Sequence, residues 1–258
     1  MKLDENMRCL VSLGNVELNG FVTSHEYISE LDAYIQQKKP SSTCFMNAHM
    51  FVESQRRKDL YLSISKFDFV CMDGVPLLWI CNAKSERTLT RMAGMDVLPL
   101  VLDLANRKNY KICFIGGTEN MMSLTRQYLH QNYPQLEDFN YYCPPFGDVT
   151  ESVLEEVLTV LNNCVPDIVF VVLGCPKQEL LMSEISGKTN ASVLAVGGAL
   201  PVLIGQQRRA PVWMQKASLE WLYRLMQEPR RLFKRYFVTN SLFLFLILKQ
   251  WLLGGRNP

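Results

Sequence analysis

Residues 166–179 read Pro166-Asp-Ile-Val-Phe-Val-Val-Leu-Gly-Cys-Pro-Lys-Gln-Glu179. The apolar run between Asp167 and Gly174 is too short for a core helix and has the length of a buried strand. Pro176 then suits the first turn of a helix that continues through Glu179. This order of strand, glycine and helix is typical of an α/β unit, in which a parallel strand leads into a helix.

The same order recurs along the chain. Short apolar runs precede helix-like stretches at residues 42–47, 67–74, 111–117 and 192–198. After the third run, Thr118 can cap a helix that continues to about Gln131. The stretch Tyr141-Tyr-Cys-Pro-Pro-Phe-Gly147 is expected to be an irregular loop. We therefore expect a Rossmann-like α/β fold with a largely parallel sheet flanked by helices, and a ligand at the carboxyl ends of the strands.

The C-terminal residues differ from the rest in charge. Residues 207–258 contain ten Lys or Arg and two Asp or Glu, whereas residues 1–206 contain 17 and 23. Apolar residues recur there at helical spacing, with a break at Pro229. The sequence thus predicts an α/β catalytic domain over residues 1–206 and a helical, arginine-rich, membrane-associating appendage over residues 207–258.

The appendage also carries an apolar stretch, Ser241-Leu-Phe-Leu-Phe-Leu-Ile-Leu248. Basic residues beside such a stretch suit anionic lipid headgroups. A spanning helix needs roughly 20 predominantly apolar residues, and Asn240, Lys249 and Gln250 interrupt the run that ends at Leu253. We expect this helix to lie on a membrane, with packing on the core or on a second subunit as the alternative.

Composition excludes several classes of protein. A hydrophobic fraction of 48% in 258 residues argues against disorder. The eight cysteines include no CxxC pair and the chain begins without an apolar signal-peptide core, which indicates a reducing cytosol. We expect no metal, no cofactor and no nucleic-acid partner. The absence of GxGxxG and of a P-loop disfavours a Rossmann-type oxidoreductase and a P-loop nucleotide enzyme.

Asp73 is the candidate catalytic residue. It ends the run Phe67-Asp-Phe-Val-Cys-Met-Asp-Gly74, so an apolar strand delivers a carboxylate to its tip. A carboxylate whose pKa is raised by a partly apolar site can accept a proton from an attacking hydroxyl. The alternative is an aspartate that caps a helix or a turn.

Glycines and arginines are the candidate phosphate ligands. The pairs Gly116-Gly117 and Gly197-Gly198 follow strands and would allow a phosphate or ribose to approach the backbone. The chain has no Asp-x-Asp with which to hold a metal against a diphosphate, so arginines must stabilise such a leaving group. The candidates are Arg208, Arg209, Arg224, Arg230, Arg231 and Arg235, some of which are expected to serve only lipid electrostatics.

Taken in order, these pieces resemble the WecG/TagA/CpsF family of bacterial glycosyltransferases, glycosyltransferase family 26, over nearly the whole chain. The matching residues are Asn47-Ala48, Asp73-Gly74, Arg91-Met-Ala-Gly-Met-Asp96, Phe114-Ile-Gly-Gly117, Pro144-Pro-Phe146, Pro166 to Glu179, Val196-Gly-Gly198, Arg209-Ala-Pro211, Glu220-Trp-Leu-Tyr-Arg-Leu225 and Glu228-Pro229.

The resemblance implies an inverting, metal-independent transfer of a sugar from a UDP-sugar to a polyprenyl-diphosphate-linked saccharide, in bacterial surface polysaccharide synthesis. The enzyme would be peripheral to the cytoplasmic face of the inner membrane, in contact with anionic lipid, and a homo-oligomer is possible. Asp73 would be the base. The substrate-binding residues would be Asn47, Arg91, Asp96, Gly116, Gly117, Gln178, Glu179, Gly197, Gly198, Arg209, Arg224, Arg230, Arg231 and Arg235.

Three departures from the family pattern leave the donor open between an N-acetylmannosamine type and a hexose. Phe45 stands where Thr is usual, Val75-Pro76 where a second Gly is common, and Ala199-Leu-Pro201 where Phe-Asp is usual. The alternative function is a non-catalytic scaffold of the polysaccharide machinery that binds nucleotide or anionic lipid.

Overall fold

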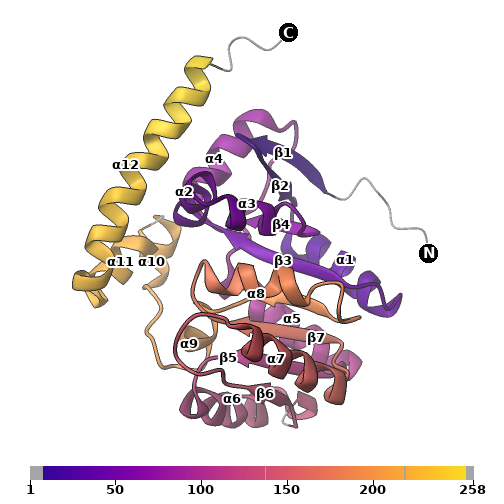
Figure 1. Cartoon of the computed structure of the whole chain (residues 1–258). Helices are drawn as coiled ribbons and strands as arrows, with labels where there is room; N and C mark the ends of the chain where they lie inside the picture. Colours follow the sequence, from indigo (N-terminus) through magenta and orange to yellow (C-terminus); the bar gives the residue numbers. More distant parts are fainter. Residues whose placement is uncertain (1–7, 137, 218, 254–258) are drawn as a thin grey trace.

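The computed structural model of the protein describes residues 8–136, 138–217 and 219–253 (Figure 1). One sheet with the order β1-β2-β4-β3-β8-β7-β5-β6 forms its centre. Its strands are β1 (Cys9–Leu13), β2 (Val16–Gly20), β3 (Ser41–Met46), β4 (Phe69–Met72), β5 (Ile112–Gly116), β6 (Asn140–Tyr142), β7 (Ile168–Val172) and β8 (Ser192–Ala195). Only the β1–β2 pair is antiparallel, which confirms the expected largely parallel α/β sheet.

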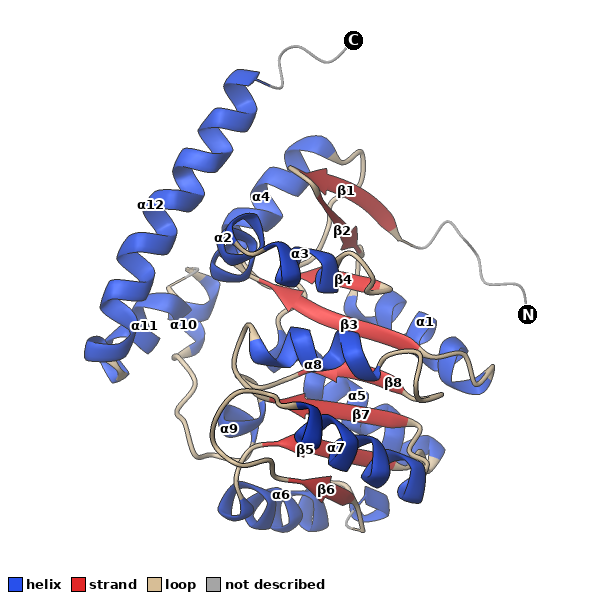
Figure 2. Ribbon diagram, viewed as in Figure 1, coloured by secondary structure: helices blue, strands red, loops and turns tan. Residues whose placement is uncertain are grey.

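Helices cover both faces of the sheet (Figure 2). One face packs on α2 (Ala48–Arg56), α3 (Lys58–Ile64), α4 (Val75–Lys84), α7 (Glu151–Cys164) and α8 (Lys177–Ile185). The other packs on α1 (Ser24–Gln36), α5 (Gly94–Lys108), α6 (Glu119–Asn132), the short 3-10 helix η1 (Pro134–Leu136) and α9 (Leu200–Leu203). The buried strands β3, β4, β5, β7 and β8 therefore carry apolar side chains on both sides, as parallel strands between helices do.

The five strands predicted from apolar runs are confirmed as β3, β4, β5, β7 and β8. Thr118 caps α6 by accepting a hydrogen bond from the Met121 amide at 3.2 Å. The expectation of an irregular loop is wrong at its start. There, Tyr141 and Tyr142 lie in β6, because they pair with Phe114 and Ile115 of β5.

Three helices follow the sheet: α10 (Val212–Lys216), α11 (Glu220–Gln227) and α12 (Pro229–Leu253). The long helix α12 runs beside α2 at the edge of the molecule (Figure 1). Phe243 of α12 is buried and packs edge-on against Phe51, with ring centroids 5.7 Å apart. Such an aromatic pair contributes about 1 kcal/mol beyond its buried area. His49 Nδ1 and Thr239 Oγ1 form a hydrogen bond at 3.2 Å in the same contact.

No helix within the described residues is both long enough and apolar enough to cross a membrane.

The turn after β8 depends on a glycine. A Cβ on Gly197 would lie 1.7 Å from the Leu173 carbonyl oxygen, whereas a Cβ on Gly198 would lie 3.8 Å from its nearest neighbour, Arg224 Nη1. Gly197→Ala is therefore expected to lower the free energy of unfolding by at least about 2 kcal/mol. Gly198→Ala, the matched control, should change it by no more than about 0.5 kcal/mol. Urea unfolding monitored by circular dichroism measures both, and equal stabilities would contradict this account of the turn.

Candidate active site

The candidate residues lie where three neighbouring strands end. Asn47 follows β3, Asp73 follows β4, and Gly197-Gly198 follow β8 closely. The ends of β3 and β4 are in close contact, since a Cβ on Gly74 would lie 3.5 Å from the Asn47 Cα. The parallel sheet thus brings residues far apart in the sequence to one edge, as expected for a ligand site.

Asn47 caps α2. Its side-chain oxygen accepts hydrogen bonds from the amides of His49 and Met50, both at 3.1 Å. This capping fixes the orientation of the side chain. The NH₂ group of Asn47 is not used by the cap, so it can donate to a ligand at the strand end.

Asp73 does not cap a helix. The N-cap of α4 is Gly74, which makes no side-chain capping bond. The backbone amide of Asp73 donates a hydrogen bond to the Met46 carbonyl at 2.9 Å, which fixes the backbone at the end of β4. The carboxylate is partly buried, and no hydrogen bond to it is recorded among the described residues. The capping role that the sequence left open is therefore absent.

Burial raises the pKa of Asp73 from 3.8 to about 6. The positive charges of Arg91 and Arg224 oppose this rise in pKa, and the negative charges of Glu220 and Asp96 add to it. A carboxyl group with a pKa near 6 is largely ionised at neutral pH and still accepts a proton readily, so Asp73 suits general base catalysis.

Gln178 and Glu179 are buried at the start of α8. The Gln178 amide donates to Glu179 Oε1 at 2.6 Å, and its oxygen accepts from the Gly197 amide at 3.3 Å. These bonds link the turn after β8 to the helix after β7. Both side chains thus lie at the strand-end edge, and their role in substrate binding stays a prediction.

Four charged side chains form a closed set of contacts beside Asp73, which we term the ion-pair ring (Arg91, Asp96, Arg209 and Glu220). Arg91 bonds to Glu220 at 2.5 Å and to Asp96 at 3.2 Å. Arg209 pairs with Asp96 as well, and its Nε lies 3.7 Å from Glu220 Oε1. Burial is the largest single effect and acts to lower the pKa of Arg91, but the hydrogen bond with Glu220 and the negative charges of Glu220, Asp73 and Asp96 together raise that pKa.

Arg224 lies next to the ion-pair ring on α11. Its Nη2 is 3.1 Å from the Met95 sulfur, and no ion pair of Arg224 is recorded among the described residues. Gly198 is nearby, and the charge of Arg224 acts on Asp73. Among the guanidinium groups that the structure describes, Arg224 is therefore the one available to receive an anionic group at the strand ends.

The remaining predicted residues lie elsewhere or are not described. Gly116 and Gly117 end β5, two strands away from β8, and both have positive φ angles of 109° and 75°. Arg230 is exposed at the start of α12. The side chains of Arg231 and Arg235 lie outside the described part of the structure.

Sequence reasoning did not identify Glu220 as a site residue. Its side chain is only 11% exposed and touches both arginines of the ion-pair ring. A signal was present, because Glu220 is one of two acidic residues in the basic segment from 207 to 258. An acid kept among many bases is a candidate ion-pair partner.

Two of the departures from the family pattern meet at one place. A Cβ on Gly94, at the start of α5, would lie 3.3 Å from the Phe45 ring and 3.7 Å from the Ala199 Cβ. The large side chain at position 45 and the small one at position 199 therefore both lie next to Gly94.

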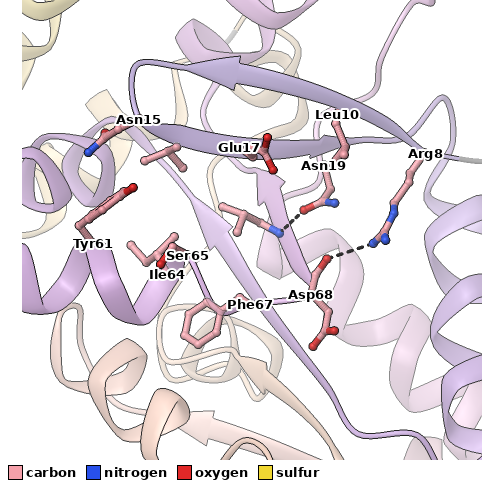
Figure 3. Close-up of a pocket in the computed structure, with 12 residues that line it drawn as sticks. Arg8, Leu10, Asn15, Glu17, Asn19, Tyr61, Ile64, Ser65, Phe67 and Asp68 are labelled. Carbon is pink, nitrogen blue, oxygen red and sulfur yellow. Dashed lines mark hydrogen bonds between the residues drawn. The ribbon is translucent and has the colours of Figure 1, made fainter.

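A cavity of about 490 Å³ lies between the β1–β2 hairpin and α3 (Figure 3). Asp68 precedes β4 at this cavity, whereas Asp73 follows β4 at the site. Arg8 donates to the Asp68 carbonyl at 3.1 Å, and Asn19 accepts from the Val70 amide at 2.6 Å. None of the predicted site residues lines this cavity. In the described residues, no group of three or more His, Cys, Asp or Glu side chains is arranged to hold a metal ion.

Comparison with known proteins assigns the chain to a class. Residues 11–257 match the model of the "Glycosyl transferase WecG/TagA/CpsF family", which places the chain among glycosyl transferases. The chain belongs to the WecG/TagA/CpsF family.

Two curated relatives have the same name, N-acetylglucosaminyldiphosphoundecaprenol N-acetyl-beta-D-mannosaminyltransferase. The one from Bacillus spizizenii is 27% identical over 207 residues, which is 80% of this chain and 79% of the relative. The one from Bacillus subtilis is 29% identical over 199 residues, which is 77% of this chain and 76% of the relative.

The raised pKa of Asp73 implies that the free energy of unfolding depends on pH. The folded-state pKa of about 6 lies above the usual 3.8, so protonation of Asp73 favours the folded chain. That contribution is complete below about pH 4 and is lost as the pH rises through 6. Asp73→Asn, which cannot ionise, should gain about 2 kcal/mol of stability relative to the parent between pH 4 and pH 7.5.

Chemical denaturation at the two pH values measures this difference. The matched control is Asp103→Asn, which alters an exposed aspartate paired with Arg107 on α5. Its effect should stay within about 0.5 kcal/mol at both pH values. A gain for Asp73→Asn that does not depend on pH would show that burial does not raise the pKa of this carboxyl.

Proposed function

We propose that the protein transfers a sugar from a UDP-sugar to a polyprenyl-diphosphate-linked saccharide, with inversion at the anomeric carbon and without a metal ion. The observation that carries the proposal is the Asp73 carboxylate at the end of β4, which is partly buried, is acted on by the charges of two arginines and makes no hydrogen bond within the described residues. Family membership supports the class of reaction. The names of the two relatives support a lipid-diphosphate acceptor that bears N-acetylglucosamine and a donor of the N-acetylmannosamine type.

The proposed reaction needs one base and one site for the leaving group. A hydroxyl of the acceptor sugar attacks the anomeric carbon of the donor, and its proton passes to Asp73. The bond from that carbon to the diphosphate breaks, and UDP leaves with its charge stabilised by Arg224. Asn47 and the backbone of Gly197 and Gly198 position the substrates, and Gln178 with Glu179 holds the turn that carries the two glycines.

The C-terminal helices are proposed to act as a membrane-docking appendage over residues 207–258. The face of α12 away from α2 exposes large apolar side chains: Phe233, Phe237, Leu244, Phe245 and Leu248, each at least 58% exposed. A helix with basic residues and such a face binds at the headgroup boundary. We therefore propose a peripheral location on the cytoplasmic face of the bacterial inner membrane, where the acceptor diphosphate is accessible.

Replacing Asp73 with Asn tests the proposed base. The parent should release UDP from one member of a UDP-sugar panel, in the presence of a short-chain lipid-diphosphate N-acetylglucosamine and EDTA. Asp73→Asn should lower kcat at least about 100-fold, because general base catalysis contributes 10²- to 10⁴-fold. Calorimetry should show UDP binding within about threefold of the parent, since the side chain keeps its shape.

Asp103→Asn should retain full transfer in the same assay. Full activity of Asp73→Asn would overturn the assignment of the base. Failure of the folded parent to turn over any donor, while it still binds nucleotide or lipid, would favour the alternative of a non-catalytic scaffold.

Changing the exposed face of α12 tests membrane docking. Phe237→Glu puts a charge at a side chain that is 69% exposed, and should reduce pelleting with anionic vesicles at least about tenfold. Transfer to a water-soluble, short-chain acceptor should be unchanged. Leu62→Glu on α3 is the matched control, because Leu62 is also exposed, and it should pellet as the parent does. Equal pelleting of all three proteins would refute α12 as the docking element.

A further inference from the structure

The ion-pair ring carries an inference that rests on the proposed function and goes beyond it. We propose that the ion-pair ring is a positioning device that holds α11 against the α/β body, so that Arg224 faces Asp73, and that its two arginines do not bind the substrate diphosphate. Arg91, Asp96, Arg209 and Glu220 are then positioning residues, and Arg224 alone among these arginines contacts the leaving group.

The ion-pair ring joins separate parts of the chain. Arg91 lies in the connection between α4 and α5, and Asp96 lies in the first turn of α5. Arg209 lies in the connection between α9 and α10, and Glu220 begins α11. Around the ring, arginine and carboxylate alternate, so that each carboxylate lies between two guanidinium groups. Two of the four contacts, both made by Glu220, tie α11 to Arg91 and Arg209, and the other two join these arginines to α5 through Asp96.

The ion-pair ring sets the position of Arg224 directly. Arg224 is four residues after Glu220, so the two side chains lie on the same face of α11. Met95, which contacts Arg224 at 3.1 Å, is the neighbour of Asp96 on α5. The start of α5 is therefore joined to α11 twice, through the ion-pair ring at Glu220 and through Arg224 in the last turn of α11.

Charge balance separates the two roles. Within the ion-pair ring, two guanidinium groups meet two carboxylates, and the side chain of Glu220 is only 11% exposed. An arginine held by two carboxylates has its charge balanced and part of its N–H donors in use, so it binds a phosphate less readily than an arginine without such partners. Arg224 has a thioether in its contact instead of a carboxylate. Binding of a diphosphate to Arg224 would therefore cost less free energy than binding to Arg91 or Arg209, because no ion pair has to be displaced.

The ion-pair ring also protects the proposed base. Arg91 and Arg224 both act on Asp73, and Arg91 is engaged by Glu220 at 2.5 Å. Without Glu220, Arg91 would keep only its contact with Asp96 at 3.2 Å, and more of its charge would act on Asp73. A carboxylate paired with a guanidinium accepts a proton less readily, because the pair favours its ionised form.

Glu220→Gln tests the proposal, because it keeps the shape of the side chain and removes its charge. The matched control is Glu184→Gln, which alters an exposed glutamate of α8 whose carboxylate lies 3.9 Å from the Lys188 ammonium group. Hydrogen–deuterium exchange without substrate should be at least about fivefold faster in α11 for Glu220→Gln and unchanged for Glu184→Gln. Asp96→Asn, at the opposite corner of the ion-pair ring, should give the same increase.

The change in UDP affinity distinguishes a positioning role from direct binding, because the two roles predict changes in opposite directions. If the ion-pair ring positions Arg224, Glu220→Gln should bind UDP at least about threefold more weakly, since Arg224 is misplaced. If Arg91 and Arg209 bind the diphosphate, releasing them from Glu220 should strengthen UDP binding. The acidic limb of the kcat/KM profile should also move to lower pH in Glu220→Gln, because the negative charge of Glu220 then no longer raises the pKa of Asp73.

Unchanged exchange in α11, or tighter binding of UDP, would overturn the proposal. The exchange measurement needs no substrate. A parent protein that neither binds UDP nor transfers sugar would therefore refute the proposed donor, while faster exchange in Glu220→Gln and Asp96→Asn would still support the docking role of the ion-pair ring.

Discussion

Removal of the Asp73 carboxylate from water disfavours its charged form, and the surrounding elements limit that cost. Burial raises the pKa of Asp73 to about 6, and the charges of Arg91 and Arg224 keep it from rising further. These two arginines come from different segments, one before α5 and one on α11. A base of this kind needs the sheet to deliver the carboxylate and the C-terminal helices to supply part of its electrostatic environment.

The sheet could be predicted from the sequence because parallel strands between helices are continuous apolar runs. Such runs gave β3, β4, β5, β7 and β8 and placed Asp73 at a strand end. The β1–β2 hairpin was missed because Ser12, Glu17 and Asn19 interrupt its apolar runs, although Gly14-Asn15 between the strands is a two-residue turn signal. β6 is only three residues long, and its pairing with β5 decides its conformation more than its own composition.

The ion-pair ring could not be predicted from the sequence. Arg91 and Glu220 are separated by 129 positions, and nothing local to either residue indicates the other. Spacing along a helix gives contacts at three or four residues, whereas contacts between a loop and a distant helix follow from tertiary packing. The same limit applies to Asn47, whose role as the cap of α2 follows from local sequence only once the helix start is known.

The packing of α12 on α2 has a mechanical consequence. α2 begins immediately after Asn47, and its side chains Phe51 and His49 contact Phe243 and Thr239 of α12. The long C-terminal helix, α2 and the end of β3 therefore form one continuous stack of close-packed side chains. Protein interiors of this density transmit displacement instead of absorbing it. A displacement of α12 would therefore be transmitted through α2 to Asn47 at its start.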